Sequence, residues 1–239
     1  MKKNYFLIIC SLIFICRGEP VNADWVNLSG AENAPNIAEI TIEKDRVRIQ
    51  LEVFVEDLMI FEELIPDSFF SKPLPGRPDL ARRQKIFAET VFQVVTGQGE
   101  NLPVTFDLVE PRLRIERPSP FAGMINPYTR RPIPGPPEDK RVLYAELSYP
   151  FKGRPKSLTF IPPLDSEGRP FVSIGFIAYH KAVPVIDFRY LGAPSVLVLD
   201  WNDPWYSKFA NPVLKRHHKD AMMSFLYVEP FEVRHEILT

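Results

Sequence analysis

The sequence predicts a mainly β protein, built as one or two antiparallel, immunoglobulin-like β-sandwiches with one or two short helices inserted near residues 57–90. Three observations predict this class. Apolar and polar residues alternate over residues 39–57. Seven further strand candidates, separated by turn residues, follow in the second half of the chain. Proline accounts for 25 of the 239 residues and glycine for only 11, which favours stiff, turn-rich connections over disorder.

The clearest local pattern is EITIEKDRVRIQLEVFVED, residues 39–57. Its apolar residues occupy every second position on either side of Lys44 and Asp45, which interrupt the alternation; they are Ile40, Ile42, Val47, Ile49, Leu51, Val53 and Val55. Because successive side chains of a strand point to opposite faces, this period predicts two strands with one buried face. The short interruption predicts that the two strands pair as a hairpin.

Helical spacing replaces the alternation in the next segment. The apolar residues of DLMIFEELI, residues 57–65, fall three to four positions apart, and Pro66 marks the end of the predicted helix. A second short helix is predicted to begin at Asp79 in DLARRQKIF. Around Phe87 the pattern fits either a helix or a strand. Beyond it we expect a strand, a Gly-Gln-Gly turn and one or two further strands.

A proline-rich stretch separates the two halves of the chain. Residues 118–139 contain seven prolines, and proline has no backbone N–H to donate within a central strand. We therefore predict an N-terminal β-rich domain at 24–117, a loop or linker at 118–140 and a C-terminal β-sandwich domain at 141–239. The alternative is a long loop within one sandwich. The strand candidates of the second half are RVLYAELSY, KSLTFIP, FVSIGFIAY, VPVIDFRYL, SVLVLDW, SFLYVEP and FEVRHEIL.

The first 23 residues have the three parts of a secretory signal peptide. Two lysines precede an apolar run at 5–15, and Val-Asn-Ala at 21–23 matches a signal-peptidase site. The run is short for a membrane span, although an uncleaved anchor is the alternative. Cys10 and Cys16 both lie in this segment, so the predicted mature chain contains no cysteine, disulfide or thiolate metal site. We expect a periplasmic or secreted protein with no membrane span after cleavage.

Charge and motifs exclude several function classes. Removing residues 1–23 leaves a net charge of about −3, which is not the basic footprint of a nucleic-acid-binding protein. The chain contains no G-x-S-x-G, H-E-x-x-H, Walker or G-x-G-x-x-G motif. Pairs of carboxylates carry no information in a chain with 30 acidic residues. The sequence therefore predicts a protein that is not an enzyme and has no catalytic residues or resident cofactor.

The aromatic segment, LDWNDPWYSKF at residues 199–209, is the predicted ligand-binding site. Trp201, Trp205, Tyr206 and Phe209 surround an Asn-Asp-Pro turn. Flat aromatic rings with polar rims, exposed on a loop, would suit a saccharide or a peptide of an envelope protein. The alternative is that the rings fold back and cover the end of the sandwich.

Three of the four histidines lie near the C-terminus and form the predicted metal site. The alternative is that they have structural roles, because strand alternation places His235 on the same face as Val233 and Ile237. The candidate ligands of the metal site are His217, His218, Asp220 and His235, a set that suits zinc, copper or nickel. Adjacent side chains of an extended chain point apart, so the site requires an irregular loop. Lys215, Arg216 and Lys219 oppose the binding of a dication. The fourth histidine, His180, is predicted to occupy an exposed turn at the end of a strand.

Two parts of the chain resemble known groups of proteins. The pattern over 37–104, with DRVRIQLEVFVEDL, Arg82-Arg83 and FQVVTGQGENLPV, resembles the extracytoplasmic β-sandwich portion of bacterial membrane proteins of the HupE/UreJ-like type. FIAYHKAVPVIDFRYLG, WNDPWYSKF and SFLYVEPFEVRHEIL are similar to bacterial exported proteins without assigned activity, which extend beyond the position of Thr239. The second resemblance implies a short or truncated member of that group. The first makes nickel or cobalt handling conceivable.

These observations lead to two functional expectations, and a hydrolase that uses scattered carboxylates is kept as a third hypothesis. The main one is an exported, non-catalytic β-sandwich protein that binds an envelope protein or a saccharide. The alternative is a periplasmic metal-binding accessory protein that uses the C-terminal histidines.

Overall fold

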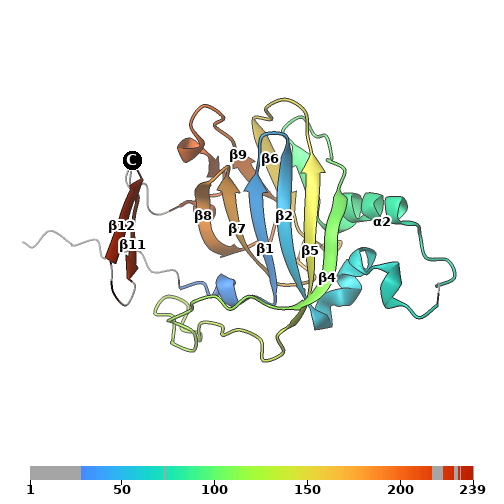
Figure 1. The fold of residues 1–239 in the computed structure, drawn as a ribbon, viewed down its shortest axis with the longest axis horizontal. Coiled ribbons are helices and arrows are strands. Elements are labelled where there is room, and N and C mark those ends of the chain that lie inside the picture. The colour runs from blue at the N-terminus through green and yellow to red at the C-terminus, as the bar shows by residue number, and fades with distance from the viewer. Residues whose placement is uncertain (1–27, 73, 217–222, 229–230, 232, 239) are drawn as a thin grey trace, which may run out of the picture. The chain divides into compact units, whose positions relative to one another are not determined.

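Two β-sheets make up most of the computed structural model (Figure 1). The structure describes residues 28–72, 74–216, 223–228, 231 and 233–238; the predicted signal peptide lies outside them. The strands of the two sheets are β1 (Asn36–Ile42), β2 (Arg46–Phe54), β3 (Gln93–Thr96), β4 (Thr105–Leu113), β5 (Arg141–Pro150), β6 (Ser157–Ile161), β7 (Ile174–His180), β8 (Val183–Tyr190), β9 (Ser195–Val198) and β10 (Lys208–Phe209). The mainly β prediction is confirmed.

The larger sheet has six strands in the order β4-β5-β2-β1-β7-β8, and the smaller has four in the order β10-β9-β6-β3. All neighbouring strands run antiparallel except β1 and β7, which pair in parallel from Asn36↔Ile174 to Ile42↔His180. The prediction of purely antiparallel sheets is therefore wrong at this one pair. A parallel pair requires a crossover, and here most of the chain separates its two members.

The predicted hairpin at 39–57 is confirmed. β1 and β2 pair antiparallel, with Ile40 opposite Ile49 and Ile42 opposite Val47. The alternating side chains from Ile40 to Val53 are all fully buried, so one face of the hairpin supplies the centre of the core. Val55 departs from the alternation because the strand has already ended there and a helix begins.

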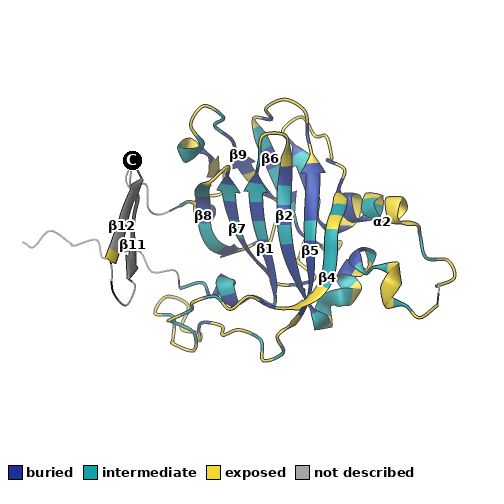
Figure 2. Ribbon diagram, in the orientation of Figure 1, coloured by how far each residue is buried: buried dark blue, intermediate teal, exposed yellow. Residues whose placement is uncertain are grey.

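One continuous core joins the two sheets (Figure 2). The ring of Phe176 in β7 meets the ring of Phe209 in β10 edge to face, with centroids 5.6 Å apart. Tyr149 in β5 is fully buried, and its hydroxyl donates a hydrogen bond of 2.7 Å to the backbone oxygen of Phe92, just before β3. A buried hydroxyl needs such a partner, since leaving it unpaired costs about 1–3 kcal/mol.

Short helices fill one side of the sandwich, as the sequence predicts for residues 57–90. They are η2 (Val55–Leu64) and η3 (Asp67–Phe69), both 3-10 helices, α2 (Leu80–Ile86) and a π-helical turn, η4 (Phe87–Val91). Asp79 caps α2 by accepting a hydrogen bond from Arg82 N at 2.8 Å. The π-helical turn accounts for the mixed pattern around Phe87. No helix among the described residues is long and apolar enough to cross a membrane.

Strands that we assigned to separate domains lie in one sheet. β2 and β4 from the predicted domain 24–117 both pair with β5 from the predicted domain 141–239. Residues 118–140 therefore connect two neighbouring strands of a sheet, and residues 28–216 belong to one compact unit. The two predicted domains are not separate because their strands share backbone hydrogen bonds. A central strand such as β5 must form hydrogen bonds on both of its sides.

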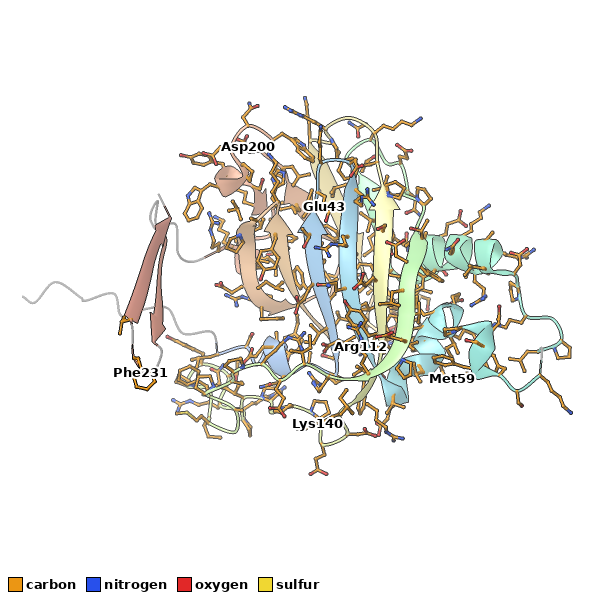
Figure 3. The ribbon with its side chains drawn as sticks, viewed as in Figure 1. Glu43, Met59, Arg112, Lys140, Asp200 and Phe231 are labelled. Carbon is orange, nitrogen blue, oxygen red and sulfur yellow. The ribbon has the colours of Figure 1, made fainter. Side chains whose placement is uncertain are left out.

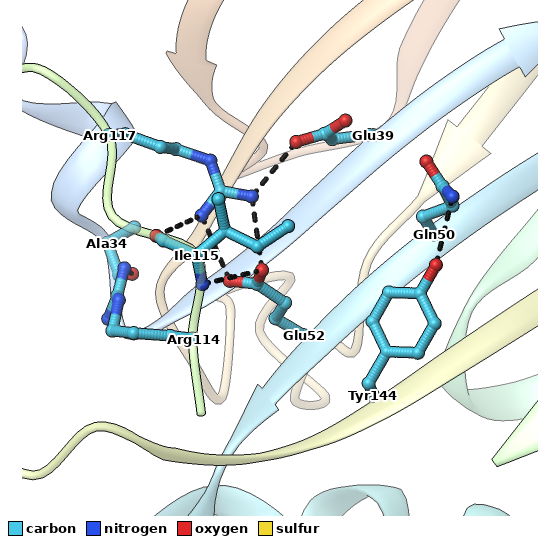
Figure 4. A network of polar contacts seen from close by, with 8 residues as sticks. All are labelled: Ala34, Glu39, Gln50, Glu52, Arg114, Ile115, Arg117 and Tyr144. Atoms are coloured by element: carbon cyan, nitrogen blue, oxygen red, sulfur yellow. Dashed lines mark hydrogen bonds and ion pairs between the residues drawn. The ribbon is translucent and has the colours of Figure 1, made fainter. Parts of the chain in front are cut away.

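An ion-pair network holds the proline-rich connection against the larger sheet (Figure 4). Arg117 donates to Glu52 Oε2 at 3.0 Å and to Glu39 Oε1 at 2.9 Å, and thereby contacts both β2 and β1. The backbone N–H of Ile115 donates to the same Glu52 carboxylate. The side chains of Arg117 and Glu52 are only 9% and 5% exposed, so water screens their interaction weakly.

A separate hairpin comprises β11 (Met223–Val228) and β12 (Val233–Leu238), which pair antiparallel from Met223↔Leu238 to Val228↔Val233. It belongs to a second unit of the chain. Both strands were expected from the sequence.

Replacing Arg117 with alanine is expected to lower the free energy of unfolding by about 3 kcal/mol, because the buried Glu52 carboxylate loses its ion-pair partner. Glu39→Gln is the matched control: the Glu39 side chain is 33% exposed, so its loss should cost less than about 1 kcal/mol. Urea unfolding followed by tryptophan fluorescence measures both values. Equal, small effects of the two substitutions would contradict the role given to Arg117.

Candidate functional site

Asp200 and Asp203 shape the aromatic segment into two successive capped turns. Asp200 Oδ1 accepts hydrogen bonds from the backbone N–H groups of Asn202 and Asp203, at 2.9 and 3.0 Å. Asp203 Oδ1 accepts one from Trp205 N at 3.0 Å and caps the 3-10 helix η5 (Pro204–Tyr206). Acidic side chains that bind nearby backbone in this way are typical of tight turns. The segment is therefore an ordered turn, and Figure 3 labels Asp200 within it.

Two of its four rings point into the protein. Phe209 is 1% exposed and packs against Phe176, so it is part of the core. Trp201 is half-buried; its Nε1 donates to the backbone oxygen of Pro155 at 2.8 Å, and its ring lies edge-on to Phe151 at 5.9 Å. Phe209 therefore offers no ring face to a ligand, and Trp201 is only partly exposed. For these two residues the rings fold back over the sandwich.

The other two rings lie further out. The guanidinium of Arg216 stacks on Trp205, with its carbon 3.8 Å from the ring centroid, and donates to the Trp205 backbone oxygen at 2.9 Å. Arg216 also donates to the backbone oxygen of Pro184 and so joins the segment to β8. Tyr206 is 63% exposed. The structure thus separates the four predicted residues into two inward rings, one ring covered by an arginine and one open ring.

His180 is fully buried, so the prediction of an exposed turn is wrong. Its Nδ1 lies 2.7 Å from Ser207 Oγ, which also accepts a hydrogen bond from Asp200 N. Trp201 covers the ring edge-on at 4.7 Å. Burial is the main cause that lowers the His180 pKa to about 4, with the Lys181 charge acting in the same direction and Asp200 against it.

The contact between Ser207 and His180 has the geometry of a nucleophile and its base. Ser207 is only 3% exposed, however, and His180 has no exposed surface, so a substrate has no access to either group. The pair instead joins the end of β7 to the aromatic segment. The spacing of the sequence gives no sign of this contact, which spans 27 residues.

The predicted metal ligands lie largely beyond what the structure describes. His217, His218 and Asp220 fall outside the described residues. His235 occupies a register position in β12 opposite Leu226, and its side chain is not described. Within the described part of the chain, no group of three His, Cys, Asp or Glu side chains is placed to hold an ion. The metal site stays a prediction.

A groove with a cavity volume of about 410 Å³ opens at the end of β4, which the sequence did not indicate. Its apolar lining comprises Val55 and Leu58 from η2, Phe69 from η3, Leu113 from β4, and Val142 and Leu143 from β5. Leu113 is 69% exposed and Phe69 is 47% exposed. Met59, next to Leu58 in η2, is 74% exposed and lies at the same end of the sheet as Arg112 (Figure 3).

The two arginines on the groove lining are both paired within the chain. Arg112 binds Glu110, and its guanidinium carbon lies 3.8 Å from the centroid of the Tyr144 ring. Arg141 hydrogen-bonds Asp139 and lowers the pKa of that carboxyl to about 2. The groove therefore offers apolar contact more than charge. Covering such surface gains about 25 cal/mol for each Å².

β4 is an edge strand, but it is poorly suited to pair with a further strand. Pro111 has no N–H to donate, and the register of β4 against β5 shifts between Phe106 and Leu108. Proline and bulges are features that protect sheet edges from unwanted pairing. A ligand of the groove would therefore bind through side chains.

Comparison of the chain with protein-family models, with curated proteins and with solved structures finds no match. The chemistry of the described surface is thus the basis for a functional proposal.

The low pKa of His180 should make the protein less stable in acid. Because the folded-state pKa of about 4 lies below the unfolded value of 6.5, the contribution is fully present above pH 6.5 and is lost as the pH falls towards 4. Between pH 7 and pH 4.5 it should decrease by about 2 kcal/mol.

The comparison uses His180→Asn, whose amide can still reach Ser207 but does not titrate. Urea unfolding at the two pH values should show a smaller loss for this variant than for the wild type. The same loss in both proteins would show that carboxyl groups elsewhere cause the acid sensitivity.

Proposed function

We propose that this chain is an exported, non-catalytic binding protein whose partner is another protein of the cell envelope. The partner would place apolar side chains in the groove at the end of β4. The observation that carries the proposal is the open groove itself, in which Leu113 and Phe69 are exposed to water. Exposed apolar surface of this kind, bordered by polar residues, is typical of interaction sites.

A protein partner fits the surface better than a saccharide does. Sugar rings are recognised by open aromatic faces, and of the four rings of the aromatic segment only Tyr206 is largely exposed. The groove, in contrast, is lined mainly by aliphatic side chains. Aliphatic surface suits the apolar side chains of a peptide segment more than the hydroxyl groups of a sugar.

Export and the finer fold assignment come from the sequence. The signal-peptide pattern at 1–23 supports a periplasmic or secreted location. The resemblance of residues 37–104 to extracytoplasmic portions of HupE/UreJ-like proteins agrees with a role in the envelope. We infer that the sandwich serves as an immunoglobulin-like scaffold, in which a rigid framework carries contact residues at its edges.

Leu113→Asp tests the proposal, because a charge in the groove should prevent an apolar segment from binding. Leu113 is exposed, so its substitution should leave the fold intact. Val213→Asp is the matched control, since Val213 is 71% exposed on the 3-10 helix η6 (Pro212–Leu214). Affinity capture from envelope extract, followed by mass spectrometry, should recover a protein with the wild type and with Val213→Asp. Leu113→Asp should lower its recovery at least tenfold.

Two outcomes would contradict the proposal. One is the recovery of the same protein by Leu113→Asp and by the wild type. The other is the capture of a glycan in place of a protein.

A further inference from the structure

The proline-rich connection carries an exposed hairpin with an unusual distribution of charge. This Tyr128 hairpin, residues 124–131, contains Arg130 and Arg131, which are the only charged residues in 118–137. Both are exposed, and neither has an ion-pair partner among the described side chains. Most other surface arginines of the described chain lie beside carboxylates, so the hairpin is locally cationic in a protein with a net charge of −1.

Three exposed apolar or aromatic side chains accompany the two cations. Tyr128 is 87% exposed, Ile125 58% and Met124 56%. The chain reverses between Ile125 and Pro132, which form an isolated antiparallel bridge, so all five side chains lie within a few residues of one tip. A tyrosine and aliphatic groups beside arginines form the composition typical of segments that lie at a membrane–water interface.

The hairpin is built as a rigid feature. Asn126 Oδ1 accepts hydrogen bonds from Tyr128 N and Thr129 N, while its Nδ2 donates to the backbone oxygen of Leu28 at 3.1 Å. Backbone bonds from Ile133 N to Met124 O and from Gly123 N to Ile133 O close its base.

The base is also fixed to the body of the protein. Ile133 is 3% exposed, and Asn33 Nδ2 donates to Pro134 O at 2.9 Å. The hairpin therefore loses little conformational entropy when it binds.

We infer that the Tyr128 hairpin docks the protein on the anionic headgroups of a phospholipid bilayer. Arg130 and Arg131 would contact phosphate groups, and Tyr128, Ile125 and Met124 would enter the interface beside them. The positive charge of the arginines attracts the hairpin to an anionic surface. The three apolar or aromatic side chains, which are exposed to water in the free protein, would be buried in the bilayer interface. This surface is independent of the groove in the proposed function.

A bilayer fits these features better than an acidic protein does. The exposed tip belongs to the connection between β4 and β5, and its residues line none of the cavities outlined for the described chain. An exposed tip with apolar side chains can insert into a fluid surface, whereas a protein partner would have to provide a matching pocket. Binding through two arginines is expected to be weak and sensitive to salt.

Sedimentation with vesicles tests this inference. The protein, purified after cleavage of the signal peptide, is mixed at low salt with vesicles of phosphatidylcholine containing one quarter phosphatidylglycerol, or with phosphatidylcholine alone. Only the anionic vesicles should bind it. Arg130→Asn with Arg131→Gln should lower the partition coefficient at least tenfold, since each arginine near an anionic surface contributes about fivefold. Asn suits the left-handed backbone of Arg130, whose φ is 58°.

Three controls keep the outcome clear. Lys152→Gln with Arg154→Gln removes two exposed cations elsewhere and should leave most of the binding. Tyr128→Ser should weaken binding without changing the charge. Leu113→Asp, which disables the groove, should not reduce binding, so failure of this inference and of the proposed function can be told apart.

The inference is overturned if the wild type does not bind anionic vesicles, if neutral vesicles bind it equally, or if both double variants lose the same affinity. Loss of an acidic protein from envelope capture by the Arg130 and Arg131 variant, with no vesicle binding by the wild type, would identify a protein as the partner instead.

Discussion

The ion pair of Arg117 with Glu52 fixes the connection between β4 and β5 to the larger sheet. The Tyr128 hairpin, one of the two proposed contact surfaces, is part of this connection. The connection between β4 and β5 is long and rich in proline, so it cannot pair as a further central strand of the sheet. Arg117 and the backbone of Ile115 attach its first part to β1 and β2. The last part of the connection packs against Asn33 and Gly30. Asn33 donates a hydrogen bond to Pro134 O, and a Cβ on Gly30 would lie only 2.7 Å from Pro134. The proline-rich connection, which the sequence presents as a possible linker, is therefore held against the sandwich at both of its ends.

Packing within the same sandwich keeps one pair of polar side chains, His180 and Ser207, away from any ligand. His180 and Ser207 are close enough to exchange a proton, but the packing of Trp201 and the adjacent strands removes both from solvent. Buried polar pairs of this kind hold elements together as long as each group has a partner. His180 Nε2 has none among the described residues, which is consistent with a neutral ring and with its low pKa.

The two proposed contact surfaces arise at places where the sandwich ends irregularly. The groove forms where β4 and β5 pass the 3-10 helices η2 and η3, because short helices leave apolar side chains uncovered. The Tyr128 hairpin forms where the connection turns back on itself. Both consist of exposed side chains on well-bonded backbone, an arrangement that separates binding from folding stability.

The sequence by itself determined the local structure of this protein. Alternation predicted β1 and β2, and Asp79 predicted the start of α2, because side-chain direction and capping depend on residues only a few positions apart. Tertiary structure alone decided that β2 pairs with β5, that β1 runs parallel to β7, and that His180 and Phe209 are buried while Leu113 is not. These properties depend on which distant segments meet, and a local pattern carries no information about that.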